Sequence, residues 1–209
     1  MACLGLMNVK QTQQRWPGNG PLPTGGVMGR CASAGGLLLA LLLFGLENAW
    51  AQKPEIPTPE ELKARFVMSF AVYTTWPPNA LAGSPHFVLG VLGSDPCINV
   101  LRASTNLVHG RKLEIRELTG PEGSEQCHMV FITARKLSAL PQVLAQIKES
   151  SVLSVVDSAQ EMRSEGVINL GIEKRQGKPW FCFEINKTAA DQAKLKLNSN
   201  LQGKARKIF

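Results

Sequence analysis

Histidine and cysteine are the residue types in this sequence that could bind a metal ion or act in nucleophilic chemistry. None of the three histidines, His86, His109 and His128, stands four residues from another metal ligand on one predicted helix. Cys127 and His128 are neighbours in a run that predicts a strand, where adjacent side chains point to opposite faces. The spacing therefore predicts neither a metal site nor a cofactor.

The sequence also lacks the common motifs of enzymes. It contains no Gly-x-Ser-x-Gly elbow and no phosphate-binding loop, and Gly90 and Gly93 are too few for a dinucleotide-binding fingerprint. Asp157 ends a predicted strand, where α/β sheets carry functional side chains, but no titratable partner is evident for it. A loop-capping role is favoured for Asp157, and we expect the protein not to be an enzyme.

Alternating strand and helix patterns predict the fold class. Short apolar or alternating runs predict strands at His86–Gly93, Lys112–Leu118, Cys127–Thr133 and Val152–Val156. Amphipathic segments predict helices at Pro59–Thr75, Pro96–Thr105, Ser138–Ser150 and Lys187–Ala205. Two further runs, Val167–Glu173 and Lys178–Ile185, predict an antiparallel hairpin. We expect an α/β protein: a three-layer α/β/α sandwich with a mixed, mostly parallel sheet and a C-terminal hairpin plus helix.

The N-terminal region predicts export. Leu37–Leu46 is an uncharged apolar run of the length found in signal peptides, with Arg30 before it and a cleavage motif ending at Ala51. Met28 is a more ordinary start for such a signal than Met1. We expect residues 1–51 to be an extension plus signal peptide, cleaved after Ala51, 52–58 a linker and 59–209 a single domain. An uncut anchor is the alternative.

Cys97, Cys127 and Cys182 remain after the expected cleavage, and export places them in an oxidising compartment. Three cysteines there predict one disulfide and one thiol left over. Cys97 and Cys127 are the candidate pair, although they are expected at opposite ends of a parallel sheet, and Cys182 is then the remaining thiol.

Several segments, in order along residues 59–205, resemble the YfiR-like family of periplasmic regulators. They are Lys63–Pro77 with its closing Thr-Trp-Pro, Val91–Pro96, Cys127–Ile132, Val152–Asp157 and Phe183–Ser199. The chain departs from the family pattern at Glu165–Ile168 and in its last helix, where Gln202, Gly203 and Lys204 interrupt an apolar stripe. These residues weaken the apolar face that a partner or dimer contact would use.

The resemblance implies a regulatory role without catalysis or cofactor. Such a protein would bind the periplasmic domain of an inner-membrane diguanylate cyclase and repress it, which lowers cyclic di-GMP and restrains biofilm growth. It would also engage an outer-membrane lipoprotein, form homodimers and carry disulfides. Trp76 and Asn186 are the candidate partner-binding residues, although an aromatic at a helix end more often packs on the core.

Charge and topology leave further alternatives. The chain has a formal net charge of +7, concentrated near the C-terminus, which suits an acidic partner, a membrane surface or simply a solvated helix face. Nucleic acid is excluded as a partner because an exported protein does not meet it. The alternative to a repressor is a small-ligand sensor with a pocket near Asp95, Thr133 and Asp157, at the carboxyl ends of the strands.

Overall fold

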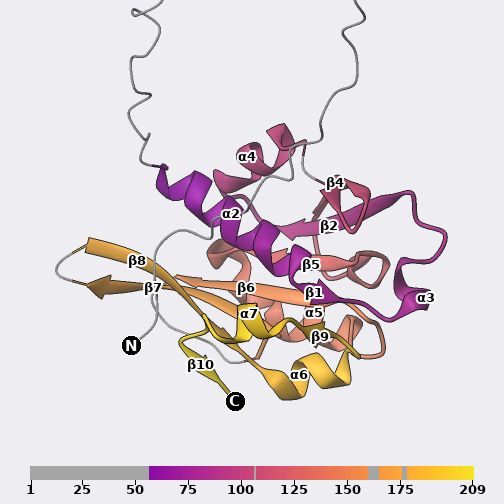
Figure 1. The fold of residues 1–209 in the computed structure, drawn as a ribbon. Coiled ribbons are helices and arrows are strands. Elements are labelled where there is room, and N and C mark those ends of the chain that lie inside the picture. Colours follow the sequence, from indigo (N-terminus) through magenta and orange to yellow (C-terminus); the bar gives the residue numbers. More distant parts are fainter. Residues whose placement is uncertain (1–56, 106, 160–164, 176–177) are drawn as a thin grey trace, which may run out of the picture. The chain divides into compact units, whose positions relative to one another are not determined.

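The computed structural model describes residues 57–105, 107–159, 165–175 and 178–209 (Figure 1). The expected signal peptide, the start at Met28, the cleavage after Ala51 and most of the 52–58 linker lie outside these residues. Within the described segments, every helix is too short or too polar to cross a bilayer.

The centre of the domain is one mixed sheet. Its strands are β2 (His86–Leu92), β3 (Leu107–Val108), β4 (Arg111–Leu118), β5 (Met129–Ile132), β6 (Leu153–Ala159), β7 (Ile168–Arg175), β8 (Lys178–Ile185) and β10 (Lys207–Ile208). They lie in the order β10-β8-β7-β6-β5-β2-β4-β3. Only the β7–β8 and β3–β4 neighbours are antiparallel. The mostly parallel sheet and the C-terminal hairpin confirm the prediction.

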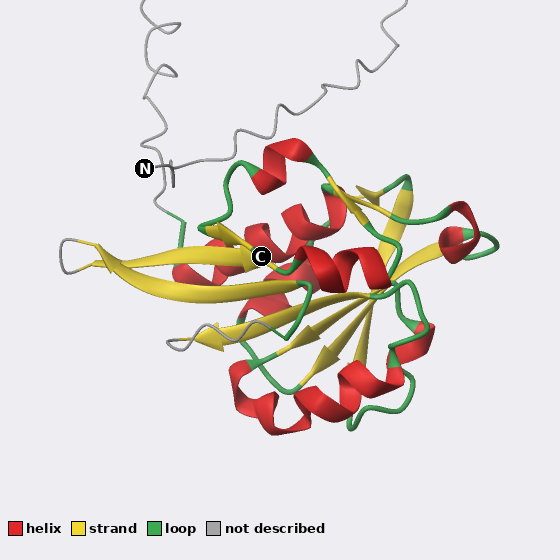
Figure 2. Cartoon of the chain, turned by 90° about the horizontal axis from the view of Figure 1, so that it is seen from below, coloured by secondary structure: helices red, strands yellow, loops and turns green. Residues whose placement is uncertain are grey.

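Helices cover both faces of this sheet, as Figure 2 shows. They are α2 (Pro59–Val72), α3 (Pro78–Leu81), α4 (Cys97–Ala103), α5 (Leu140–Gln146), α6 (Lys187–Gln192) and α7 (Ser199–Gln202), with 3-10 turns η1 (Ser124–Gln126) and η2 (Ala134–Ala139). The predicted three-layer arrangement is therefore present. It follows from strands whose side chains are apolar on both faces, each of which must be buried.

Helix α2 begins where the sequence predicts. The Thr58 hydroxyl accepts a hydrogen bond from the backbone N–H of Glu61, and the Glu61 carboxylate accepts one from the Thr58 N–H. This capping box satisfies two backbone donors at the helix start. The helix ends three residues earlier than expected, because Thr74 and Thr75 form strand β1.

The two faces of the sheet have different cores. On the α2 face, the rings of Phe66 and Phe70 pack edge-on against Phe183 of β8, with ring centroids 6.2 and 5.1 Å away. On the α5 face, a second cluster joins alternate residues of β2, β5 and β6 to the helix. Its buried members include Val88, Leu92, Val130, Ile132, Leu140, Val143 and Val156.

The predicted helix Lys187–Ala205 is wrong. The chain instead forms α6, a short strand β9 (Lys196–Leu197), α7 and the edge strand β10. Lys194 adopts a left-handed backbone conformation (φ 58°) that ends α6, and β9 then pairs antiparallel with β1. Burial of Leu195 and Leu201 favours this route over a continuous helix. Consequently the basic residues of this region do not line one solvated helix face.

Candidate functional site

Trp76, a candidate partner-binding residue, is instead a core residue. It is 5% exposed, and its Nε1–H donates a hydrogen bond to the carbonyl of His128, 3.1 Å away. Its ring lies edge-on to Phe87, with centroids 5.2 Å apart. Direct contact between this side chain and a partner is therefore excluded by burial.

His128 is equally committed to the fold. Its Nδ1 accepts a hydrogen bond from the backbone N–H of Val88 at 2.8 Å, and its ring stacks on Phe87. Burial, followed by the nearby Arg111 cation, lowers the pKa of His128. Among the described residues, no group of three or more His, Cys, Asp or Glu side chains could hold a metal ion.

Asn186, the other candidate partner-binding residue, caps α6. Its Oδ1 accepts a hydrogen bond from the backbone N–H of Ala189 at 2.9 Å. The side chain is partly buried, and this bond fixes the start of the helix. Its observed role is therefore structural.

The carboxyl ends of β2 and β6 carry the most concentrated charge in the described interior. Nζ of Lys63, on α2, lies 2.7 Å from Oδ2 of Asp95 and 2.8 Å from Oδ2 of Asp157. The three side chains are only 4 to 15% exposed. The structure thus brings together Asp95 and Asp157, which the sequence places at strand ends, and supplies the cation between them.

The electrostatics of this cluster favour charged side chains. Burial alone would lower the pKa of Lys63, but its hydrogen bonds to Asp157 and Asp95 outweigh that effect and raise it. Burial would likewise raise the pKa of Asp95, but hydrogen bonds from Lys63 and from the backbone N–H of Cys97 lower it overall. The group is an ion triad at neutral pH.

The turn after β2 holds this cluster in place. Gly93 has φ +93°, and a Cβ there would collide with the Thr133 hydroxyl. That hydroxyl donates a hydrogen bond to the carbonyl of Leu92 at 3.0 Å. Thr133 therefore locks the end of β2 to the end of β5, beside the ion triad, and does not stand open to a ligand.

Sequence reasoning missed Lys63. The signal was a lysine on the buried side of α2, three residues before Phe66 and four before Val67, where an apolar residue is expected. A buried lysine needs anionic partners, and the two aspartates at strand ends supply them.

The disulfide expected between Cys97 and Cys127 is absent from the structure, in which both are free cysteines. Cys97 begins α4, at the carboxyl end of β2 on the α2 face, whereas Cys127 packs in the α5-face cluster before β5. Burial first, and then the neighbouring Asp95 carboxylate, raise the pKa of the Cys97 thiol. Burial raises the pKa of Cys127 to about 11. Cys182 is buried in β8.

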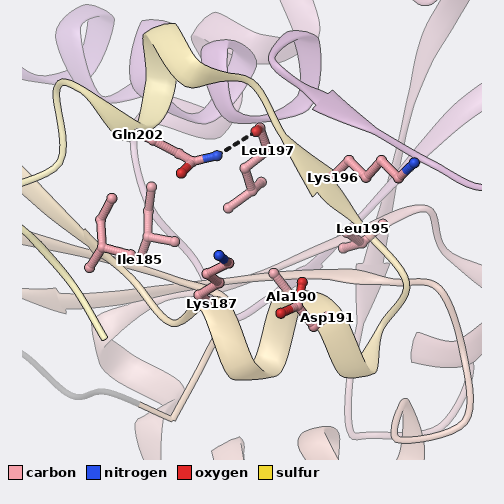
Figure 3. Close-up of a pocket in the computed structure, with 9 residues that line it drawn as sticks. Ile185, Lys187, Ala190, Asp191, Leu195, Lys196, Leu197 and Gln202 are labelled. Atoms are coloured by element: carbon pink, nitrogen blue, oxygen red, sulfur yellow. Dashed lines mark hydrogen bonds between the residues drawn. The ribbon is translucent and has the colours of Figure 1, made fainter.

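Two pockets lie away from the ion triad. One of about 220 Å³ is formed by the C-terminal segments, and Figure 3 shows the side chains around it. Its lining residues are Ile185, Lys187, Ala190, Asp191, Leu195, Lys196, Leu197, Gln202 and Ile208. The other, of about 310 Å³, lies between α4 and β4. Neither includes Asp95, Thr133 or Asp157.

The β7–β8 hairpin projects past the flanking helices (Figure 2) and carries an exposed apolar side chain on each of its two faces. Trp180 is 43% exposed and Ile172 is 37% exposed. Large exposed aromatics are typical of protein interfaces. The Trp180 face of the hairpin is therefore one described surface suited to a protein partner.

Comparison with known proteins gives one family match. A family model described as YfiR/HmsC-like matches residues 60–206. No curated protein matches the chain significantly.

Two solved structures also align with the chain. A conserved domain protein from Vibrio cholerae O1 biovar El Tor is 12% identical, with a TM-score of 0.49, over 73% of this chain and 60% of that one. The ABC domain in complex with L-Trp from Streptococcus pneumoniae is 11% identical, with a TM-score of 0.43, over 58% of this chain and 55% of that one. The chain thus spans less than two thirds of either protein.

Proposed function

The chain belongs to the YfiR/HmsC-like family, and we propose that it binds the periplasmic part of an inner-membrane diguanylate cyclase and represses it. Membership supports a periplasmic regulatory protein, and we expect it not to be an enzyme. Repression would lower cyclic di-GMP signalling, and relief would come from an outer-membrane lipoprotein. The match over residues 60–206 carries this proposal.

The geometry supports a binding protein in two ways. The strand ends, where α/β folds place ligands, are closed by the Lys63 ion triad and by the Thr133 hydrogen bond. The projecting hairpin offers Trp180, which is 43% exposed, to a partner. A small-ligand sensor, the alternative, has less support because Asp95 and Asp157 are already ion-paired with Lys63.

Capture by the cyclase tests this function. The exported protein would be purified from a periplasmic extract and titrated against the periplasmic domain of the diguanylate cyclase encoded beside it, by biolayer interferometry. We expect binding at micromolar or tighter, and a fall in cyclic di-GMP synthesis when both proteins are present in membranes. No binding, with normal folding by circular dichroism, would overturn the repressor role and favour the ligand sensor.

A further inference from the structure

His128 is a buried histidine that the fold holds in its neutral form. It lies directly before β5 and is 8% exposed. Its Nδ1 accepts a hydrogen bond from the Val88 N–H at 2.8 Å, and its own backbone N–H donates to the Val88 carbonyl at 3.0 Å. A backbone N–H can only donate, so Nδ1 must carry a lone pair and no proton. The geometry therefore requires an uncharged ring.

Protonation of this ring is incompatible with the observed contacts. An imidazolium has an N–H at both ring nitrogens and no acceptor, so the Val88 N–H would lose its partner at the start of β2. A buried N–H without a partner costs free energy, and so does a buried charge. The ring also stacks on the fully buried Phe87, with centroids 5.2 Å apart. The start of β2 therefore depends on the protonation state of one histidine.

The surroundings of the ring favour its neutral form. Burial has the largest effect and lowers the pKa of His128 from its ordinary value of 6.5, and the Arg111 cation on β4 lowers this pKa further. A hydrogen bond to the backbone of Ala80 and the carboxylate of Glu114 oppose the shift without reversing it. Glu114 also faces the exposed His86, whose Nδ1 lies 3.6 Å from its Oε2. The ring is therefore neutral at pH 7.

The segment 77–85 lies beside the ring and leads into β2. It contains α3 and no titratable side chain. Arg111 holds this segment by donating hydrogen bonds from Nε to the Ser84 carbonyl and from Nη2 to the Leu81 carbonyl, each at 3.0 Å. A proton on His128 would place a second cation near this guanidinium. Like charges in a partly buried site repel each other strongly, which favours movement of the segment.

We propose that His128 is an acid-sensitive latch at the start of β2. Protonation of its ring releases the Val88 N–H, and segment 77–85 moves away so that water reaches the imidazolium. The contacts of Phe66 and Phe70 with β8 do not involve this ring, so the domain stays folded while the latch opens. The inference goes beyond the proposed function, because the latch requires no cyclase, and its test is independent of cyclase binding.

Trp76 reports on the latch, because its Nε1–H donates to the His128 carbonyl. After the expected cleavage Trp76 and Trp180 are the tryptophans that remain, so Trp180→Phe leaves one reporter. Acrylamide quenching of its fluorescence would be measured on the exported protein from about pH 7.5 to about pH 5, above the ordinary range of carboxyl groups. We expect the quenching constant to rise about threefold, with a midpoint below pH 6.5 and an unchanged far-ultraviolet circular dichroism spectrum.

The variant His128→Asn separates the latch from other effects of acid. The asparagine Oδ1 can accept the Val88 hydrogen bond and does not titrate, so we expect quenching to become independent of pH. His109→Asn is the matched control. His109 also lies against Trp76, with ring centroids 5.6 Å apart, but its Nε2 faces the Ala71 carbonyl at 3.1 Å, a contact that a protonated ring keeps. Asparagine tolerates the positive φ of this position (49°), and we expect the transition to remain.

Hydrogen exchange gives a second readout that needs no substitution. The protection factor of the Val88 amide should fall at least tenfold between about pH 7.5 and about pH 5, after correction for the intrinsic exchange rate. The Thr133 amide, which donates to the Leu92 carbonyl at the other end of the same two strands, should stay protected. A quenching transition that persists in His128→Asn, loss of the whole fold at about pH 5, or unchanged protection of Val88 would overturn the proposal.

Discussion

Single residues show how burial changes chemistry in this domain. Cys97 and Cys127 lie in a chain predicted to be exported, yet each is a buried free cysteine whose pKa is raised. A thiol reacts through its thiolate, so a raised pKa suppresses oxidation and alkylation at neutral pH. The family expectation of a disulfide therefore does not transfer to this pair.

The raised pKa values of Cys97 and Cys127 predict that both thiols are alkylated slowly. With the pKa of Cys127 raised to about 11, we expect alkylation by iodoacetamide to be about a hundredfold slower than for an ordinary thiol, and slower still at Cys97. The rate should rise as pH approaches about 11 and should become normal in urea. Mass spectrometry of tryptic peptides measures both sites. An intact mass lower by two hydrogen atoms, with Cys97 and Cys127 unreactive in urea, would show a disulfide between them and contradict the prediction of two free thiols.

Gly93 illustrates a second residue-scale constraint. Gly93→Ala would place a methyl group against Thr133 and force a non-glycine residue into positive φ. We expect a loss of about 3 kcal/mol in the free energy of unfolding, measured by urea titration. Gly83→Ala is the control, because Gly83 also has positive φ (75°) but no atom within 4 Å of the added carbon. We expect Gly83→Ala to lower the free energy of unfolding by about 1 kcal/mol. If Gly93→Ala and Gly83→Ala lower it equally, the contact with Thr133 is unimportant.

At the scale of elements, sequence periodicity predicts a helix or strand well where one of its faces is buried. It predicts poorly where a strand pairs with residues far away in the sequence. The capping box predicts the start of α2, and alternation in Lys112–Leu118 predicts a strand with one wet face or an edge position. Strand β4 covers these residues and has only the two-residue β3 on its outer side. The helical spacing of Ala189, Ala190, Ala193 and Leu197 predicts a long helix that is not present. Leu197 instead pairs with Thr74, more than a hundred residues earlier, and no local period records that contact.

The hairpin of β7 and β8 is the element that we expect to contact the cyclase. Trp180→Ser should weaken capture at least tenfold, because exposed aromatics carry a large share of interface energy. The free energy of unfolding should change by less than about 0.5 kcal/mol, since the side chain is 43% exposed. Val72→Ser, at a similarly exposed position on α2, is the control. Equal capture by both variants would place the interface elsewhere.

For the domain as a whole, one lysine joins three elements. Lys63 ties α2 to the ends of β2 and β6 through Asp95 and Asp157. The aromatic contacts of Phe66 and Phe70 with β8 hold the same helix on the sheet. The position of α2 therefore depends on a charged contact and an apolar one together.

Removing that lysine should destabilise the domain. Lys63→Met leaves two largely buried carboxylates without their shared cation, and we expect a loss of about 3 kcal/mol near pH 7. Asp95 has a lowered pKa, so its stabilising contribution is present above its ordinary value of 3.8 and is lost as pH falls through the lower folded value. The difference between the two proteins should therefore shrink in acid.

Urea unfolding at about pH 7 and about pH 2 measures this difference. Lys148→Met, at an exposed lysine after α5, is the control and should change stability by less than about 0.5 kcal/mol. A Lys63→Met protein as stable as the original at about pH 7 would show that the ion triad does not hold α2.

The sequence by itself determined the α/β class, the positions of the main strands along the chain and the family. Apolar periodicity and the order of motifs can be read directly from the chain. The sequence also placed Asp95, Thr133 and Asp157 close together at the carboxyl ends of the strands, because parallel strands end on the same side of the sheet. Only the tertiary structure decided that Lys63 lies between the aspartates at these strand ends and that Trp76 is buried. It also decided that Cys97 and Cys127 lie apart and that most of the outer side of β4 has no paired strand among the described residues. Each of these depends on which elements pack against each other, and packing is set by contacts between residues distant in the chain.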